Sequence, residues 1–292
     1  MIITSTSAST ASNIVAPTRV VEVDGERYAY RRFGAGSELP LLCLQHFTGT
    51  LDNWDPAVTD PIAAGREIIL FDNAGVGRST GTVPKTVAGM AQHALAFLDG
   101  LGISSCDVLG YSLGGMVALQ MAQVSPAIFR KMILVGTAPR GGEDIMHLEK
   151  PNLAKNLNDP KLQGYEVLQK IFFTSTETSQ AAGKEFIERL GQRKDDLDRP
   201  SDRDVAANQL AAFRDWEEFT DERFADLKSV RQPTLVVNGV RDEMIPVSNS
   251  YRLVENLPNA MLIVYPDAGH GSLFQYHNLF VSQVEDFLTG EF

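Results

Sequence analysis

A serine flanked by glycines is the feature of this sequence most suited to chemistry. Ser112 lies in the stretch "GYSLG" (110–114), where an apolar run ends and a helical pattern begins. A sharp strand-to-helix turn lifts such a side chain clear of a sheet and leaves backbone N–H groups free at the helix N-terminus. A serine hydroxyl becomes a nucleophile when a base accepts its proton and donors stabilise the resulting oxyanion. The stretch therefore predicts a catalytic nucleophile.

The base is expected to be a histidine that follows the serine along the chain. Five histidines are present, and His270 alone follows a buried apolar run on a turn, in "YPDAGHGSLF" (265–274). His46 precedes the serine. The others lie in helical patterns or in a charged segment: His93, His147 and His277. We therefore predict that His270 is the base.

An acid at the end of the preceding apolar run would complete the set. Asp242 comes three residues after the run "PTLVVNG" (233–239). Glu243 is adjacent and would point elsewhere, and Asp267 shares the loop of His270, where the role of a turn former suits it better. We expect Asp242 to hold the imidazole in one tautomer and to stabilise the imidazolium without taking its proton.

The elements around these residues predict an α/β fold. A hairpin is indicated where apolar and polar residues alternate around "DG" (24–25). Short, almost wholly apolar runs are typical of strands buried on both faces, and helical patterns lie between them. Together they predict a mostly parallel eight-stranded sheet with helices on both faces. The runs cover residues 40–45, 66–72, 106–110, 131–136, 233–239 and 260–265.

One segment breaks this alternation. Residues 141–230 carry 32 of the 63 charged residues and contain helical patterns but no strand-like run. We interpret them as a helical cap inserted into the α/β domain. The predicted organisation is a disordered Ser/Thr/Ala-rich tail at 1–17, a catalytic domain at 18–139 and 231–292, and a cap at 140–230.

Composition narrows the partners and the location. A formal net charge of −11 without a basic run argues against nucleic acid and anionic membrane surfaces. The sequence has no run apolar enough to span a membrane and no pattern of a signal peptide. Cys43 and Cys106 lie in apolar runs and are expected to be buried thiols. We expect a cytoplasmic protein that acts on a small molecule with no metal or cofactor; the oligomeric state, a homo-oligomer included, stays open.

The chain resembles the α/β-hydrolase fold family from about residue 18 to residue 292. Four motifs in order carry the resemblance: "LQHFTG" (44–49), "FDNAGVGRS" (71–79), "GYSLGG" (110–115), and the pair "GVRDEMIP" (239–246) with "DAGHG" (267–271). It is most similar to the cap-bearing serine branch, which includes esterases, lactonases, cofactor-free haloperoxidase-like enzymes and carbon–carbon bond hydrolases. Dehalogenases and epoxide hydrolases of this family use an aspartate where this chain has Ser112, which argues against both.

The resemblance assigns further residues. By alignment, the N–H groups of Phe47 and Leu113 would form the oxyanion hole. His46 occupies the position of a glycine in the usual His-Gly pair, and either bonds nearby backbone or touches substrate. Aromatic residues of the cap either hold it together or line an apolar pocket above the serine. The candidate pocket residues are His46, Trp54, Tyr111, Phe172 and Trp216.

The resemblance implies a serine hydrolase that cleaves a small to medium, largely apolar ester or lactone through an acyl-enzyme. One alternative is a carbon–carbon bond hydrolase of ring-cleavage products, whose carboxylate substrates would require a cation such as Arg78, Arg140 or Arg241. Another is a receptor on the same fold that binds a small ligand without turnover. Multiple turnover would separate the enzymes from the receptor.

Overall fold

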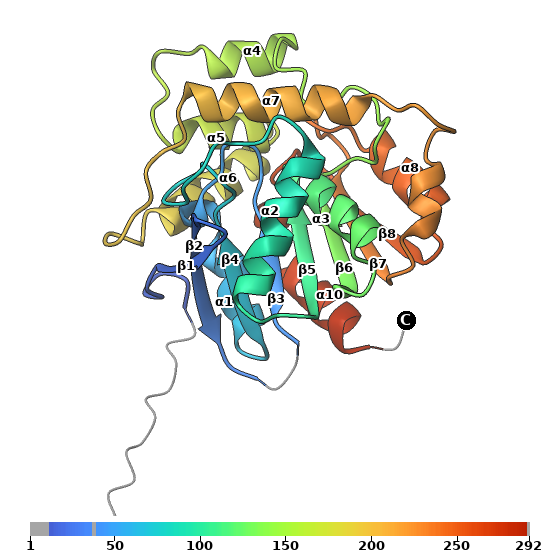
Figure 1. Cartoon of the computed structure of the whole chain (residues 1–292). Helices are drawn as coiled ribbons and strands as arrows, with labels where there is room; N and C mark the ends of the chain where they lie inside the picture. The colour runs from blue at the N-terminus through green and yellow to red at the C-terminus, as the bar shows by residue number, and fades with distance from the viewer. Residues whose placement is uncertain (1–11, 37–38, 291–292) are drawn as a thin grey trace, which may run out of the picture.

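The computed structural model describes residues 12–36 and 39–290, and an eight-stranded sheet lies at its centre (Figure 1). The strand order is β1-β2-β4-β3-β5-β6-β7-β8. The two pairs that involve β2 are antiparallel, and all other pairs are parallel. This confirms the predicted mostly parallel sheet. The strands are β1 (Arg19–Val23), β2 (Glu26–Gly34), β3 (Leu41–Leu44), β4 (Glu67–Phe71), β5 (Cys106–Tyr111), β6 (Phe129–Val135), β7 (Thr234–Gly239) and β8 (Ala260–Tyr265).

The first two strands form the hairpin that the sequence predicts. Val23 pairs with Glu26, which leaves a two-residue loop. Asp24 and Gly25 have φ angles of 51° and 84°. Two positive φ angles are typical of a type I′ turn, whose twist matches that of the flanking strands.

Helices cover both faces of the sheet. Helices α2 and α3 pack together on one face, whereas α1 and α10 pack together on the other (Figure 1). The α-helices are α1 (Pro56–Ala63), α2 (Val87–Gly100), α3 (Leu113–Val124), α4 (Pro151–Leu157), α5 (Glu166–Phe172), α6 (Glu177–Leu190), α7 (Arg203–Glu217), α8 (Ser248–Asn256), α9 (Ser272–Gln275) and α10 (His277–Thr289). Two 3₁₀ helices, η1 (Leu51–Asn53) and η2 (Ala225–Ser229), complete the set.

Helices α4 to α7 come between β6 and β7, with no strand between those two in the described chain. Figure 1 shows them gathered at one end of the sheet; below, "the cap" denotes residues 140–230. The parallel strands β3, β5, β7 and β8 all point their carboxyl ends toward the same edge of the sheet. The loops that follow these strands therefore meet at one place.

A charged cluster joins the cap to the hairpin side of the sheet. The fully buried Arg31 of β2 donates a hydrogen bond of 2.5 Å to the Asp52 carboxylate. Arg193, which follows α6, lies 3.8 Å from the same carboxylate, and the Asp198 N–H donates to its other oxygen at 2.7 Å. We call this set, completed by Asp196 beside Arg193, the ionic junction.

The segment before β1 corrects one prediction. Residues 12–17 were expected to be disordered, yet Asn13 and Ala16 are buried. The Arg193 guanidinium donates to the carbonyl oxygens of Asn13, Ile14 and Ala16 at 2.9 to 3.0 Å. A distant arginine thus orders a segment of low-complexity composition. The remainder of the predicted tail, residues 1–11, lies outside the described residues.

The state of the cysteines and the character of the helices can be compared with the sequence predictions. Both cysteines are buried free thiols, as predicted. Burial raises the pKa of the Cys43 and Cys106 thiols well above its ordinary value, which keeps them protonated. Among the described helices, none has the length and apolar character needed to cross a membrane.

Candidate active site

Ser112 lies in a strained turn between β5 and α3. Its φ and ψ angles are 57° and −118°, a region that non-glycine residues rarely adopt. Such a conformation costs about 1–3 kcal/mol and persists where the surroundings impose it. Here the Ser112 N–H donates to the Val135 carbonyl at 2.8 Å, and its own carbonyl accepts from Thr137 Oγ1 at 2.8 Å. The backbone of β6 and the residues that follow it thus hold the serine in place.

The flanking glycines are required by close packing. A Cβ on Gly110 would lie 2.6 Å from the carbonyl oxygen of Gly114, and a Cβ on Gly114 would lie 2.1 Å from that of Leu44. Both distances are shorter than a carbon–oxygen contact permits. The two glycines therefore let helix α3 start directly against β5 and β3.

His270 and Asp242 form a buried pair. His270 Nδ1 lies 2.7 Å from Asp242 Oδ2. The other carboxylate oxygen accepts from the N–H groups of Met244 and Ile245, both at 2.9 Å. An ionised carboxylate only accepts, so the proton between the pair sits on Nδ1 and leaves Nε2 with a lone pair. This is the tautomer that a general base needs.

The two rejected acids point elsewhere, in agreement with the sequence interpretation. Glu243 accepts from Asn152 of α4 at 3.0 Å. Asp267 sits in a turn with a φ of 48° and accepts from Thr174 and Thr176 of the cap at 2.9 and 2.6 Å. The hydrogen bonds from Thr176 and Thr174 lower the pKa of Asp267. Asp267 is thus a turn residue that ties the cap to the loop of His270.

Ser112 and His270 meet in a small cavity. It has a volume of 110 Å³, and its walls combine the strand-end loops with the cap. Ser112 Oγ and His270 Nε2 are both buried and have no hydrogen-bond partner among the described residues. Catalytic hydrogen bonds often tighten only when substrate is bound. The cavity is lined by His46, Phe47, Thr48, Ser112, Leu148, Leu157, Val167, Leu168, Ile171, Phe172, Met244 and His270.

The cavity corrects part of the predicted pocket. His46 and Phe172 line it, but Trp54, Tyr111 and Trp216 do not. Trp54 faces the segment before β1, where its carbonyl accepts from Asn13 at 2.9 Å. Aromatic character made these residues candidates, but it does not tell which side of an element a residue faces.

Tyr111 and Trp216 have structural contacts instead. The Tyr111 hydroxyl donates to the His270 carbonyl at 3.2 Å, and its ring packs against the His270 ring with centroids 5.1 Å apart. The Trp216 indole donates to the Ala138 carbonyl at 3.0 Å and anchors the end of α7 to the strand domain.

Several wall residues were missed by the sequence interpretation. Val167, Leu168 and Ile171 of α5 line the cavity together with Leu148, Leu157 and Met244. The α5 residues follow an i, i+1, i+4 spacing that is typical of one apolar helix face. That spacing was the signal available in the sequence.

An aromatic cluster covers His270. Phe186 of α6 stacks on Phe274 of α9 with ring centroids 4.5 Å apart. Phe172 meets His270 edge-on at 5.4 Å, and its carbonyl accepts from the Gly271 N–H at 2.9 Å. We call Phe172, Phe186 and Phe274 the aromatic junction. Phe172 is the member of this junction that lines the cavity.

Both predicted oxyanion donors lie beside the nucleophile. Phe47 lines the cavity, and Leu113 is the first residue of α3, whose N–H the helix itself cannot satisfy. Neither N–H has a hydrogen-bond partner within the described ranges. The next residue, Thr48, has a φ of 58° and donates its N–H to Gln209 Oε1 at 2.6 Å. Gln209 is a buried residue of the cap helix α7 that the sequence interpretation did not identify.

His46 makes the backbone contact of its first predicted alternative, and the alternative of a substrate contact stays a prediction. Its Nδ1 lies 2.7 Å from the Phe47 carbonyl, and its Nε2 is buried without a partner among the described residues. Burial lowers the pKa of His46 to about 3, and the nearby His270 contributes in the same direction. His46 is therefore neutral at physiological pH.

The three candidate arginines lie outside the cavity. Arg78 pairs with Asp196 of the ionic junction. Arg140 donates to the Asp215 carbonyl at 3.0 Å and lies over the Trp216 ring at 4.5 Å. The cavity walls listed above contain no Lys or Arg.

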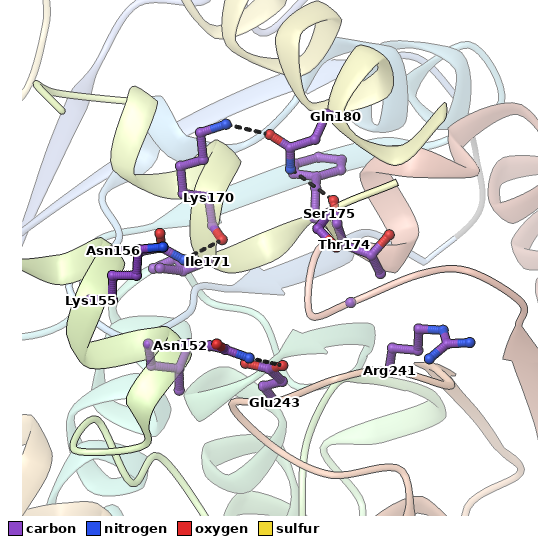
Figure 2. Close-up of a pocket in the computed structure, with 13 residues that line it drawn as sticks. Asn152, Lys155, Asn156, Lys170, Ile171, Thr174, Ser175, Gln180, Arg241 and Glu243 are labelled. Carbon is purple, nitrogen blue, oxygen red and sulfur yellow. Dashed lines mark hydrogen bonds between the residues drawn. The ribbon is translucent and has the colours of Figure 1, made fainter. Parts of the chain in front are cut away.

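Arg241 lies in a second, larger cavity on the outer side of the same loops. Figure 2 shows this space between the cap segments around Asn156, Lys170 and Gln180 and the loop that holds Arg241 and Glu243. Its volume is 460 Å³. Ile171 borders both cavities, so α5 separates the polar outer space from the apolar inner one.

Comparisons with known proteins agree with this architecture. A family model described as alpha/beta hydrolase fold matches residues 40–275. A solved alpha/beta hydrolase fold protein from Chitinophaga pinensis is 44% identical, with a TM-score of 0.89 over 96% of this chain and all of that one.

Two curated relatives carry names of hydrolases. A candidate carbamate hydrolase, RutD, from Caulobacter sp. (strain K31) is 30% identical over 82% of this chain and 86% of its own. The 2-hydroxy-6-oxononadienedioate/2-hydroxy-6-oxononatrienedioate hydrolase 1 of Dechloromonas aromatica is 26% identical over 81% of each chain.

Proposed function

The chain belongs to the α/β-hydrolase fold family and is a hydrolase, and we propose that it cleaves a small to medium, largely apolar carboxylic ester or lactone. Ser112, His270 and Asp242 act as nucleophile, base and orienting acid. The observation that carries the proposal is the strained Ser112 turn opening into the same cavity as an imidazole held by Asp242 at 2.7 Å.

The reaction proceeds in two halves. His270 Nε2 takes the hydroxyl proton as Ser112 Oγ attacks the carbonyl carbon, and the N–H groups of Phe47 and Leu113 bind the oxyanion. The imidazolium, stabilised by Asp242, gives its proton to the leaving alkoxide, which departs. His270 then removes a proton from water, which attacks the acyl-enzyme, and Ser112 regains its proton as the acid is released.

The character of the cavity supports an uncharged substrate. Its volume of 110 Å³ suits a short acyl chain, and most of its walls are aliphatic or aromatic. No cation among the lining residues offers a partner for a carboxylate, and burying an unpaired anion is costly. A cytoplasmic location is part of the proposal and is supported by the two unpaired thiols.

A second candidate function is carbon–carbon bond hydrolysis, favoured by the name of the Dechloromonas relative. A dioate with a 6-oxo group has a ketone and no ester, so its hydrolysis must break a carbon–carbon bond. The same triad would serve, but the substrate brings two carboxylates. The only candidate arginine that borders a cavity is Arg241, in the outer space, and this ranks the ester first.

Hydrolysis of p-nitrophenyl esters from acetate to decanoate tests the proposal. We expect multiple turnover with a preference for short chains, and a loss of at least about a thousandfold in kcat for Ser112→Ala. Ser125→Ala, at the other end of α3, serves as the matched control and should retain activity. Turnover that survives Ser112→Ala would contradict the proposal. Binding without turnover would favour a receptor, and cleavage of 6-oxo-dioates alone would favour the second candidate.

A further inference from the structure

The cavity contains a second histidine that the proposed mechanism does not use. His46 follows β3, and its Nδ1 lies 2.7 Å from the Phe47 carbonyl oxygen. A carbonyl oxygen only accepts, so Nδ1 must carry the proton. A neutral imidazole has one N–H, so Nε2 carries a lone pair and acts only as an acceptor. The local backbone thus fixes the tautomer of His46.

The ring of His46 is held firmly. It meets Tyr111 and Phe172 edge-on, with centroids 5.4 and 5.2 Å away. On another side the chain passes so close that a Cβ on Gly49 would lie 2.9 Å from His46 Cε1. The ring cannot turn to find another partner without breaking these contacts. Nε2 is buried and unpartnered among the described residues of a side chain that lines the cavity.

Among the described residues that line the cavity, Phe47 has an unpartnered backbone N–H, which the proposed mechanism assigns, with that of Leu113, to the oxyanion. Thr48 already donates its hydroxyl to the Phe47 carbonyl at 2.7 Å and its N–H to Gln209 at 2.6 Å. In the proposed mechanism, Ser112 gives its single hydroxyl proton to His270. The other wall residues are aliphatic or aromatic. A donor for His46 must therefore come from a molecule that enters the cavity, and the substrate is the molecule that the cavity is placed to hold.

His46 is unsuited to act as a second base. Burial lowers its pKa to about 3, and no carboxylate supports its Nδ1–H as Asp242 supports that of His270. A base this weak leaves a substrate proton where it is and shares it in a hydrogen bond. The histidine is thus an acceptor placed beside the reacting groups.

We propose that His46 Nε2 accepts a hydrogen bond from a hydroxyl or amide N–H of the substrate, and that the natural substrate is an ester or lactone carrying such a donor close to its scissile carbonyl. The inference rests on the proposed function and narrows its substrate class. A site built around a polar contact rejects an analogue that lacks the partner more strongly than an apolar pocket rejects a change of size. A carboxylate at this position would meet a lone pair and be repelled.

Paired substrates test this selectivity. The probes are p-nitrophenyl butanoate, its 2-hydroxy and 3-hydroxy derivatives, and the matching methoxy esters, which keep the oxygen but lack the donor. For the native protein we expect one hydroxy ester to exceed its methoxy partner at least tenfold in kcat/KM. The ratio is taken within one preparation, so a loss of folded enzyme cancels.

Two variants separate the nitrogens of His46. His46→Asn places its amide near Nδ1, where it can still donate to the Phe47 carbonyl but reaches no further; the hydroxy-to-methoxy ratio should fall to about one. His46→Gln places an oxygen near Nε2 and should restore part of the ratio. Methoxy esters as good as their hydroxy partners at both positions in the native protein, or a ratio unchanged in His46→Asn, would overturn the inference.

A spectroscopic measurement covers the case in which the variants fail to fold. Side-chain ¹⁵N NMR of the native protein at pH 7 should show His46 protonated at Nδ1 only, and a doubly protonated or Nε2–H ring would overturn the inference. Ser112-dependent hydrolysis without hydroxyl preference would refute the role of His46 and leave the proposed function standing. The absence of Ser112-dependent hydrolysis would refute both.

Discussion

The cap meets the sheet domain through two junctions of opposite chemistry. The ionic junction places charged groups of both parts in contact: Asp52 of the sheet domain lies 2.5 Å from Arg31 of the same domain and 3.8 Å from Arg193 of the cap. The aromatic junction stacks rings beside His270, with the centroids of Phe186 and Phe274 4.5 Å apart. The first lies beside the hairpin, and the second borders the cavity.

This difference in chemistry suggests different roles for the two junctions: the ionic junction attaches the cap, and the aromatic junction shapes the cavity. Buried charges cost desolvation energy and tolerate only one geometry, so the ionic junction fixes where the cap sits. Aromatic contacts are less directional and exclude water, so the other junction sets the polarity and size of the cavity. Changes at the ionic junction should alter stability most, and changes near the cavity should alter substrate use.

The largest expected effect is at Arg31. Arg31→Met leaves the Asp52 carboxylate buried without its main partner, and we expect a loss of about 3–5 kcal/mol in the free energy of unfolding, measured in urea. The neighbouring pair of Arg32 with Glu67 is about one-third exposed, so Arg32→Met should cost about 1 kcal/mol or less. Equal losses in the two variants would contradict the distinction.

Phe172→Ala tests the other junction. Removing this fully buried ring should cost about 3 kcal/mol of stability and open the wall over His270. We also expect the variant to prefer p-nitrophenyl esters with a longer acyl chain than the native protein prefers. A loss of stability alone would not cause this change. Phe219→Ala, at an exposed ring of the same cap, should change neither property. An unchanged chain-length preference in Phe172→Ala would argue that the ring does not bound the substrate.

A smaller effect is expected where the cap touches the oxyanion loop. Gln209→Leu removes the acceptor of the Thr48 N–H and should displace Phe47 by a fraction of an ångström. We expect kcat to fall about tenfold with little change in KM, because the lost stabilisation concerns the oxyanion. Asn208→Ala, one residue earlier on α7, is the control. A rise in KM with an unchanged kcat would instead indicate that Gln209 contacts the substrate.

The smallest effect concerns Asp198. Its side chain is 1% exposed. Burial and the Asp52 anion raise the pKa of Asp198 to about 6, although the positive charges of Arg31 and Arg78 act to lower it. Between about pH 4 and pH 6 the folded state then binds more protons than the unfolded state, so stability falls as pH rises.

Asp198→Asn removes this titration. We expect it to stabilise the protein by about 1 kcal/mol at pH 7.5, a rise of roughly 2–4 °C in Tm, and to have no effect near pH 4. The N–H bond from residue 198 to Asp52 is kept. Asp195→Asn, exposed in the same loop, should show no such pH dependence. A stabilisation that is equal at both pH values would contradict the assignment.

The sequence was sufficient to predict those structural features that depend on residues close together in the chain. Apolar runs such as 106–110 predicted buried strands, and the "DG" turn predicted the hairpin, because both signals are local. Ser112, Asp242 and His270 were each predicted to follow an apolar run, and the parallel strands bring the ends of those runs to one edge.

The remainder depended on contacts between distant residues. Arg193 orders the segment at 13–16, and Gln209 holds Thr48, across more than 150 positions in each case. Trp54 and Trp216 were predicted as aromatic pocket residues, but the direction in which each side chain faces is set by tertiary packing. No pattern within one segment carries that information.

The most direct test of the account is covalent labelling of the nucleophile. The native protein is treated with an organophosphonyl fluoride, and the site of modification is found by peptide mass spectrometry. We predict one adduct per chain, on Ser112, that is absent in Ser112→Ala and forms far more slowly in His270→Asn, because the imidazole no longer activates the hydroxyl. An adduct on another residue, or labelling of native protein no faster than of Ser112→Ala, would contradict the assignment of Ser112 as an activated nucleophile.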